Sequence, residues 1–222
     1  MRIVCMTNEG QLPMMKSMLN SAKKAGFPMH LFHCFILSTN KDPASYNTKQ
    51  FQSITIKKLE VILMNMNLDK EVLWVDNDIY FFENIISDVK RYMGSFVMQD
   101  DLWGFCTGFF LVRSSPNSKR LIQNCIDRLK NSAIESQNDQ HVFNNEYNSM
   151  TKSVIFGLKI QKLPQDEYPN GEVYFCQGRK SKSKMVHCNW IETTAEKVQI
   201  LKTAGLWNES DDGFNMTTRY SI

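Results

Sequence analysis

The feature that most constrains the fold is a short, fully apolar segment that ends in two acidic residues. Residues 72–75 read Val-Leu-Trp-Val, and Asp76-Asn77-Asp78 follows at once. Four apolar residues without alternation are typical of a strand buried on both faces, as in a parallel sheet covered by helices. Residues 79–82 are apolar or aromatic again, so two carboxylates interrupt a stretch in which burying charge is costly unless something compensates it.

The chain before this strand alternates between strand and helix patterns. Apolar runs over 2–6 and 31–37 predict strands, and apolar residues at helical spacing predict helices over 12–26 and 54–66. This order predicts an α/β fold with a mostly parallel central sheet flanked by helices.

The second half is less regular. It predicts strands over 95–99 and 108–113, an amphipathic helix over 118–130, a helix from near Asp139 and another from about Ala195. Without a repeat or a linker, we predict one domain over residues 1–210 and a frayed tail over 211–222.

Composition and charge exclude several classes of protein. The 222 residues include 26 Lys and Arg against 23 Asp and Glu, a nearly balanced charge of +3 that does not suit a nucleic-acid partner. No apolar run approaches the roughly 18 to 20 residues that span a bilayer, and the N-terminus lacks the pattern of a secretory signal. The six cysteines are scattered, as free thiols are in a reducing compartment. We expect a cytoplasmic protein with no membrane span.

The two acids after the buried strand suggest a ligand site. Ligands of open α/β sheets gather beyond the carboxyl ends of the strands, which is where Asp76 and Asp78 stand. Hard divalent cations such as Mg²⁺ or Mn²⁺ prefer oxygen ligands and leave positions for phosphate oxygens, so the pair suggests a site for a metal and a diphosphate. A polar turn is the alternative. His187, which follows two apolar residues, is by pattern alone more typical of a hydrogen-bonded core residue than of a ligand.

Five sequence blocks, in order, resemble the nucleotide-diphospho-sugar transferases of the GT-A fold, which are glycosyltransferases with a DxD motif. Together they extend over nearly the whole chain, and the DUF271-like branch that includes plant cell-wall transferases is the most similar. The blocks are Lys58 to Phe82 with the DxD, Thr107-Gly108-Phe109-Phe110 with Arg113, Asp139-Gln140 with Phe143-Asn144, Tyr168-Pro169-Asn170-Gly171, and His187-Cys188-Asn189-Trp190 with Lys197.

The resemblance implies a role for each matching residue. Asp76, Asp78 and His187 would hold Mn²⁺, with Mg²⁺ as the alternative, against the diphosphate of the donor. The metal would neutralise charge on the leaving nucleoside diphosphate. The residues expected to contact the donor are Thr7, Asn8, Lys58, Asp76, Asn77, Thr107, Gly108, Gln140 and Lys197.

Asp139 is the preferred catalytic carboxylate, and Asp100 is the second candidate, with Asp101 as its rival. An inverting transferase needs a general base at this position, whereas a retaining one uses a carboxylate to stabilise an oxocarbenium-like centre. The sequence leaves both roles open. For Lys58, a place on a solvated helix face is an equally good interpretation.

The expected function is therefore transfer of a hexose-type sugar from a UDP-sugar to a hydroxyl of a glycan acceptor. Golgi relatives carry a membrane anchor that this chain lacks, which implies a cytosolic enzyme or a domain of a longer polypeptide. A viral protein, acting in the host cytoplasm, is a further expectation. Where the branch pattern has Gly after His-x-Asn-Trp, this chain has Ile191-Glu192-Thr193-Thr194, which leaves the donor sugar open.

Two other functions fit parts of the pattern. Phosphohydrolases of the haloacid-dehalogenase type also place Asp-x-Asp after an apolar strand, although theirs is normally the first strand of the core. The basic stretch Arg179 to Lys184 would suit a non-catalytic module that binds an anionic polymer. A sugar-binding relative that has lost its catalytic activity is a second non-catalytic alternative.

Overall fold

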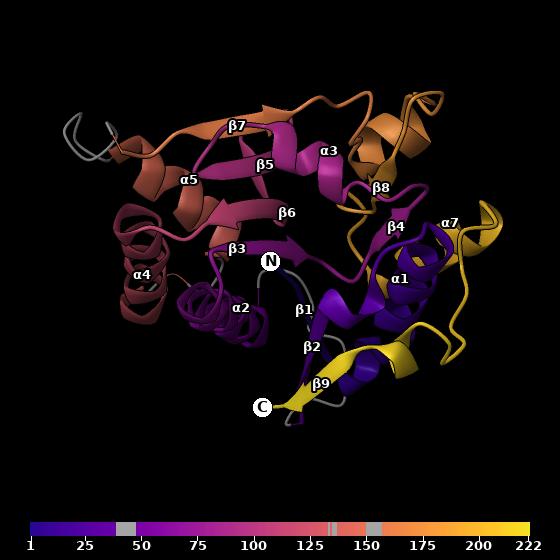
Figure 1. Ribbon diagram of the computed structural model, residues 1–222, viewed down its shortest axis with the longest axis horizontal. Helices are drawn as coiled ribbons and strands as arrows, with labels where there is room; N and C mark the ends of the chain where they lie inside the picture. The colour runs from indigo at the N-terminus through magenta and orange to yellow at the C-terminus, as the bar shows by residue number, and fades with distance from the viewer. Residues whose placement is uncertain (39–47, 133, 135–136, 150–156) are drawn as a thin grey trace.

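The computed structural model describes residues 1–38, 48–132, 134, 137–149 and 157–222 (Figure 1). Within these ranges, helices and strands alternate along most of the chain. They are β1 (Arg2–Asn8), α1 (Leu12–Lys24), β2 (Phe32–Leu37), α2 (Lys49–Leu68), β3 (Glu71–Val75), β4 (Ile79–Phe81), α3 (Ile86–Arg91), β5 (Phe96–Asp100), β6 (Phe105–Arg113), α4 (Pro116–Asn131), α5 (Asp139–Ser149), β7 (Ile160–Leu163), β8 (Met185–His187), α7 (Thr194–Thr203) and β9 (Thr218–Ser221).

Seven strands form one mixed sheet in the order β7-β5-β6-β3-β1-β2-β9. Only β6 runs against its neighbours; the pairs β1–β2, β1–β3, β2–β9 and β5–β7 are parallel. The carboxyl ends of β1, β3 and β5 and the start of β6 therefore lie along the same edge of the sheet. This confirms the predicted α/β fold with a mostly parallel sheet.

Helices cover both faces of the sheet (Figure 1). Successive residues of β3 point to opposite faces: Leu73 and Val75 join the core cluster that includes α1, whereas Val72 and Trp74 join the cluster that includes α2 and α4. All four are at most 1% exposed. Burial on both faces explains the unbroken apolar run in the sequence.

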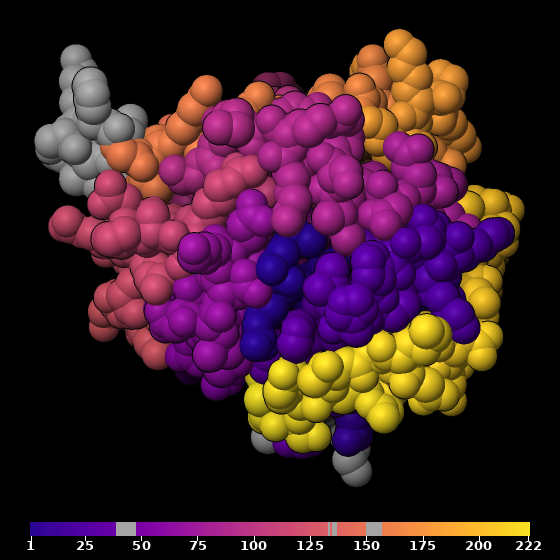
Figure 2. Space-filling model, viewed as in Figure 1, coloured from indigo at the N-terminus to yellow at the C-terminus, as the bar shows by residue number. Residues whose placement is uncertain are grey.

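The C-terminal residues are not frayed, which corrects the prediction for 211–222. Residues 218–221 form β9, which pairs in parallel with β2, and Phe214 is buried in the core. Figure 2 shows this segment lying against the N-terminal part of the chain. The prediction failed because four residues, Thr-Arg-Tyr-Ser, have no apolar pattern, and this edge strand is stabilised by backbone hydrogen bonds to β2.

A second, two-stranded sheet joins β4 to β8, with Ile79 opposite His187. The chain reaches β8 through a segment fastened to α3 by Asp88, which accepts a hydrogen bond from Tyr168 and pairs with Lys184 at 2.6 Å. Burial alone would raise the pKa of Asp88, but these hydrogen bonds lower it to about 2.

We expect Asp88→Asn to reduce the free energy of unfolding at pH 7 by about 2 kcal/mol, because a pKa lowered from near 4 to about 2 corresponds to roughly 2.5 kcal/mol and solvent screens part of it. Because its pKa is lower in the folded protein, Asp88 stabilises the fold at pH values above its unfolded-state pKa near 4. This stabilisation is lost as the pH falls toward 2. The difference between variant and wild type should therefore shrink below pH 4. Urea unfolding at pH 7 and pH 3.5 measures it, with Asp127→Asn on the exposed face of α4 as the control; equal stabilities at pH 7 would contradict the prediction.

Candidate active site

Asp76 directly follows the carboxyl end of β3, and its side chain lies on the face of the sheet that α2 covers. It shares this face with Trp74, two residues earlier, whose indole nitrogen donates to Asp76 Oδ1 at 2.6 Å. Burial and the neighbouring charge of Asp78 raise the pKa of Asp76, while Lys58 acts in the opposite direction. The carboxylate is thus oriented by the strand that carries it.

Lys58 projects from α2 and lies between two carboxylates. Its Nζ is 3.1 Å from Asp76 Oδ1 and 2.9 Å from Asp139 Oδ2, and it stands over the ring of Trp74. The residue is only 7% exposed, so the solvated helix face considered for it is wrong. Burial lowers the pKa of Lys58, but Asp139 and Asp76 outweigh that effect and raise it.

Asp78 is the buried member of the motif and contacts two cationic groups. Its Oδ1 is 3.1 Å from His187 Nε2, and its Oδ2 is 2.7 Å from Lys197 Nζ on α7. Burial raises the pKa of Asp78, but Lys197 and His187 outweigh burial and hold it far below its usual range. Burial likewise lowers the pKa of His187, and Asp78 reverses that effect and raises it well above its usual value.

The other side of the His187 ring is held by a residue that sequence reasoning missed. Gln99, at the end of β5, donates through Nε2 to the carbonyl oxygens of Tyr168 and Pro169. Its Oε1 therefore faces His187 Nδ1, at 2.7 Å, and accepts the ring proton there. Nε2 is left to face the two aspartates, as in histidines that bind metals. The one signal for Gln99 is a polar residue at the end of an apolar strand.

Gly108 leaves the space in which these groups meet. A Cβ added at this position of β6 would lie 2.2 Å from His187 Cε1 and 2.7 Å from Asp76 Oδ2. Any side chain would therefore push the imidazole or the carboxylate out of place. The predicted role of Gly108 in a close approach thus has a concrete geometric basis in this cluster.

Asp76, Asp78 and His187 form the one metal-compatible group of three His, Cys, Asp or Glu side chains found in the described part of the chain. One ligand atom from each residue lies within 4.8 Å of the other two. Two carboxylates and an imidazole can hold a divalent cation such as Mn²⁺ or Mg²⁺ and still leave positions for other oxygens. The three residues therefore fit a divalent cation.

A second polar cluster surrounds Asp101, which is 8% exposed. Asp101 accepts hydrogen bonds from Gln140 Nε2 at 2.7 Å, and from Asn189 Nδ2 and Trp190 Nε1 at 2.8 Å each. Gln140 Oε1 in turn accepts from the backbone of Thr107. Of the predicted site residues, Gln140 and Thr107 are thus brought together here.

Asp100 does not join either cluster. Its carboxylate pairs with Lys162 of β7 at 2.7 Å, because side chains alternate between the faces of the strand and Asp100 points away from Asp101. Asp139 is 5% exposed at the first turn of α5 and holds Lys58. Of the two carboxylates predicted to be catalytic, the structure therefore brings only Asp139 next to the DxD.

The end of β1 lies on the other side of the DxD. Thr7 and Asn8 are buried there, and the side chain of Asn8 accepts from the backbone of Gln11. Asn77 Nδ2 donates to the carbonyl oxygen of Met6 at 2.7 Å, which attaches the DxD loop to β1. Asn77 Oδ1 is buried and has no hydrogen-bond partner among the described residues.

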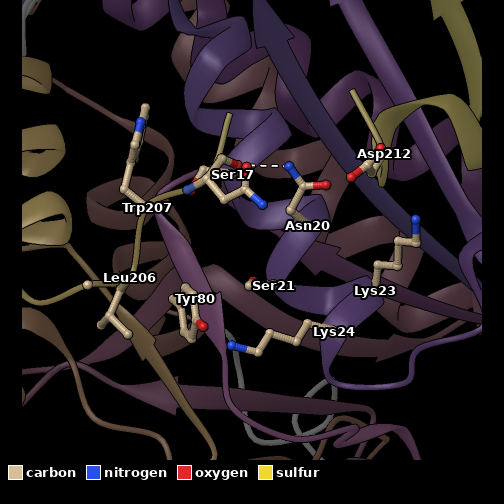
Figure 3. Close-up of a pocket in the computed structure, with 11 residues that line it drawn as sticks. Ser17, Asn20, Ser21, Lys23, Lys24, Tyr80, Leu206, Trp207 and Asp212 are labelled. Atoms are coloured by element: carbon tan, nitrogen blue, oxygen red, sulfur yellow. Dashed lines mark hydrogen bonds between the residues drawn. The ribbon is translucent and has the colours of Figure 1, made fainter. Parts of the chain in front are cut away.

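A separate hollow of about 360 Å³ lies between α1, β4 and residues 205–212 (Figure 3). Its lining includes Asn20, Lys24, Tyr80 and Trp207, and Asn20 donates to the carbonyl oxygen of Asn208 at 2.8 Å. None of the residues predicted to bind donor or metal lines it.

A family model described as "Nucleotide-diphospho-sugar transferase" matches residues 14–201. The chain belongs to this family of glycosyltransferases. The match includes the DxD, Asp139-Gln140 and His187, and it excludes the haloacid-dehalogenase interpretation. No helix in the described ranges is long and apolar enough to cross a membrane.

Two curated proteins are similar in sequence. The chain is 26% identical over 220 residues to "UDP-galactose:fucoside alpha-3-galactosyltransferase" of Dictyostelium discoideum. This match covers 85% of the chain and 34% of that protein. It is 19% identical over 211 residues to "UDP-D-xylose:L-fucose alpha-1,3-D-xylosyltransferase 3" of Arabidopsis thaliana. This match covers 81% of the chain and 54% of that protein. The chain thus spans about a third and about half of these relatives.

Solved structures confirm the fold. A glycosyltransferase involved in the glycosylation of the major capsid of PBCV-1 matches with a TM-score of 0.62 at 13% identity, covering 91% of this chain and all of the other. The galactosyltransferase LgtC, in complex with donor and acceptor sugar analogs, matches with a TM-score of 0.58 at 11% identity, covering 97% of this chain and 99% of the other. The GT-A arrangement predicted from the sequence is the observed one.

We expect Gly108→Ala to weaken Mn²⁺ binding about tenfold or more while the protein stays folded, because the added methyl displaces His187 or Asp76. Titration of Mn²⁺ followed by electron paramagnetic resonance measures the affinity. Gly157→Ala is the control, since its Cβ would meet only the side chain of Asn117. Equal affinity in the two variants would show that the cluster tolerates a side chain at 108.

Proposed function

We propose that this chain transfers a sugar from a UDP-sugar to a hydroxyl of a glycan acceptor, with Mn²⁺ as its cofactor and Mg²⁺ as the alternative. One observation carries the proposal: in a member of the nucleotide-diphospho-sugar transferase family, Asp76, Asp78 and His187 converge at the carboxyl edge of the sheet. A metal bound there supplies positive charge opposite the diphosphate as the glycosyl bond breaks.

The lysines of the site act beside the metal ligands. Lys58 and Lys197 each pair with one DxD carboxylate, so a diphosphate held by a metal at these carboxylates would lie within their reach. Their ammonium groups can hold phosphate oxygens and stabilise the leaving nucleoside diphosphate. Asn77 Oδ1, buried and free to accept, suits a hydroxyl of the ribose.

We infer that Asp139 contacts the transferred sugar. It is held by Lys58 next to Asp76, and the adjacent Gln140 is held by Asp101 and Thr107. These contacts fix the start of α5 between the metal ligands and the end of β5. Whether Asp139 removes the acceptor proton or stabilises the sugar cation depends on the stereochemistry of transfer.

The names of the two relatives narrow the substrates. Both specify a UDP-sugar donor, a fucose-type acceptor and an alpha-3 linkage, while the donor sugars differ. We propose a fucose residue as the acceptor and UDP-galactose or UDP-xylose as the donor. Location in the cytoplasm, viral origin and membership of a longer polypeptide stay predictions from the sequence.

The first experiment is calorimetric titration with UDP, with and without Mn²⁺, and with GDP as a control. We expect micromolar UDP binding that requires Mn²⁺ and is abolished in Asp78→Asn, because that variant removes the charge shared by His187 and Lys197. Asp127→Asn on α4 should bind like the wild type. UDP binding of equal strength without metal would overturn the metal assignment, and absence of nucleotide binding would overturn the donor.

Transfer itself is tested with methyl α-L-fucoside as acceptor and UDP-galactose or UDP-xylose as donor. Asp139→Asn should keep UDP binding and lose turnover by about a hundredfold or more. Normal turnover in this variant would move the catalytic role to another carboxylate, and a parallel variant of Asp101 would then identify it.

A further inference from the structure

Two bulky residues with strained backbone lie beside the same buried carboxylate. Leu102, with φ of 62°, and Trp190, with φ of 68°, are the two non-glycine residues in the left-handed region among those the structure describes. Side chains of this size rarely adopt that conformation, and such strain is concentrated at functional sites. Leu102 follows Asp101 directly, and Trp190 donates its indole N–H to Asp101 at 2.8 Å.

The indole of Trp190 is held rigidly but faces solvent. Asp101 is fixed by two further hydrogen bonds, from Gln140 and Asn189. Asn189 Oδ1 also accepts from the backbone of Gly171, so the segment that carries Trp190 is fastened on both sides. Nevertheless, half of Trp190 is exposed. An aromatic ring that is already ordered loses little entropy when a ligand covers it.

The position of this ring along the sheet edge indicates which ligand it meets. The strands run in the order β1, β3, β6, β5 (Figure 1), so Thr7 and Asn8 lie on one side of the DxD and Asp101 on the other. If the nucleoside occupies the β1 side, the side of β5 remains for the acceptor. β5 is two strand spacings from β3, about 10 Å, which leaves room for one transferred sugar ring over β6.

Three apolar side chains close to Asp101 are exposed. Trp103 is 87% exposed, Leu102 40% and Trp190 50%. The C–H groups on one face of a pyranose ring pack against the electron-rich face of an indole, and the C6 methyl of a 6-deoxy sugar adds apolar area. We propose that Trp190, anchored by Asp101, is the platform on which the sugar ring of the acceptor stacks. This inference rests on the proposed transfer and identifies its acceptor side.

The test measures acceptor binding directly, independently of turnover. Saturation-transfer NMR is recorded with methyl α-L-fucoside and a panel of other methyl glycosides, on protein loaded with UDP and Mn²⁺. For the glycoside that the wild type binds, we expect Trp190→Ala to weaken binding about tenfold. Trp190→Phe should weaken it less, since an aromatic ring remains although its hydrogen bond to Asp101 is lost. Met93→Ala is the control, because Met93 is 73% exposed and precedes β5 at the opposite edge of the sheet.

Unchanged glycoside binding in Trp190→Ala would overturn the inference, as would a wild type that binds none of the glycosides while it still binds UDP. Titration of the protein with UDP in the presence of Mn²⁺ distinguishes failure of this inference from failure of the proposed function, because Trp190→Ala should bind the nucleotide like the wild type. Loss of nucleotide affinity in a variant that keeps its fold would instead place Trp190 on the donor side and overturn the inference.

Discussion

The structure depends on the compensation of charge at the carboxyl end of β3. Asp76, Asp78 and Asp139 bring three carboxylates to one largely buried cluster, in which they would repel one another and lose hydration. Lys58 bridges two of them, and Lys197 and His187 contact the third. Three cationic groups come from α2, α7 and β8, so distant parts of the chain must pack correctly before the apolar strand can end in acids.

The sheet turns this local requirement into an ordered site. Strands that share one edge place Asn8, the DxD, Gly108 and Asp101 side by side, in the order β1, β3, β6, β5. His187 reaches the DxD because β4 continues directly from it and pairs with β8. Gly108 then leaves the space in which imidazole and carboxylate meet. Backbone topology thus decides which side chains can act together, and small residues decide how closely they approach.

The sequence predicts the fold well and the site in part. The buried strand and its acids are visible because charge rarely follows an apolar run, and the start of α5 at Asp139 is as predicted. Gln99 was missed because its importance arises from two carbonyl groups brought to it by another part of the chain. Asp100 was preferred over Asp101 because neighbouring acids look alike in a sequence, whereas the strand sends them to opposite sides. β9 was missed because backbone pairing leaves no side-chain pattern.

The charge of the cluster is compatible with the metal and diphosphate of the proposed function. As a metal ligand His187 would be neutral, so the three carboxylates and two ammonium groups would then sum to −3 + 2 = −1 before the metal itself is counted. The two negative charges of a nucleotide-sugar diphosphate alone would lower this sum to −3, whereas a divalent cation bound together with the diphosphate would hold it at −1. Under the proposed function, a bound metal would therefore favour binding of the diphosphate. The lysines that pair with the carboxylates would then be near enough to contact phosphate oxygens, so the proposed function would use residues that also stabilise the cluster.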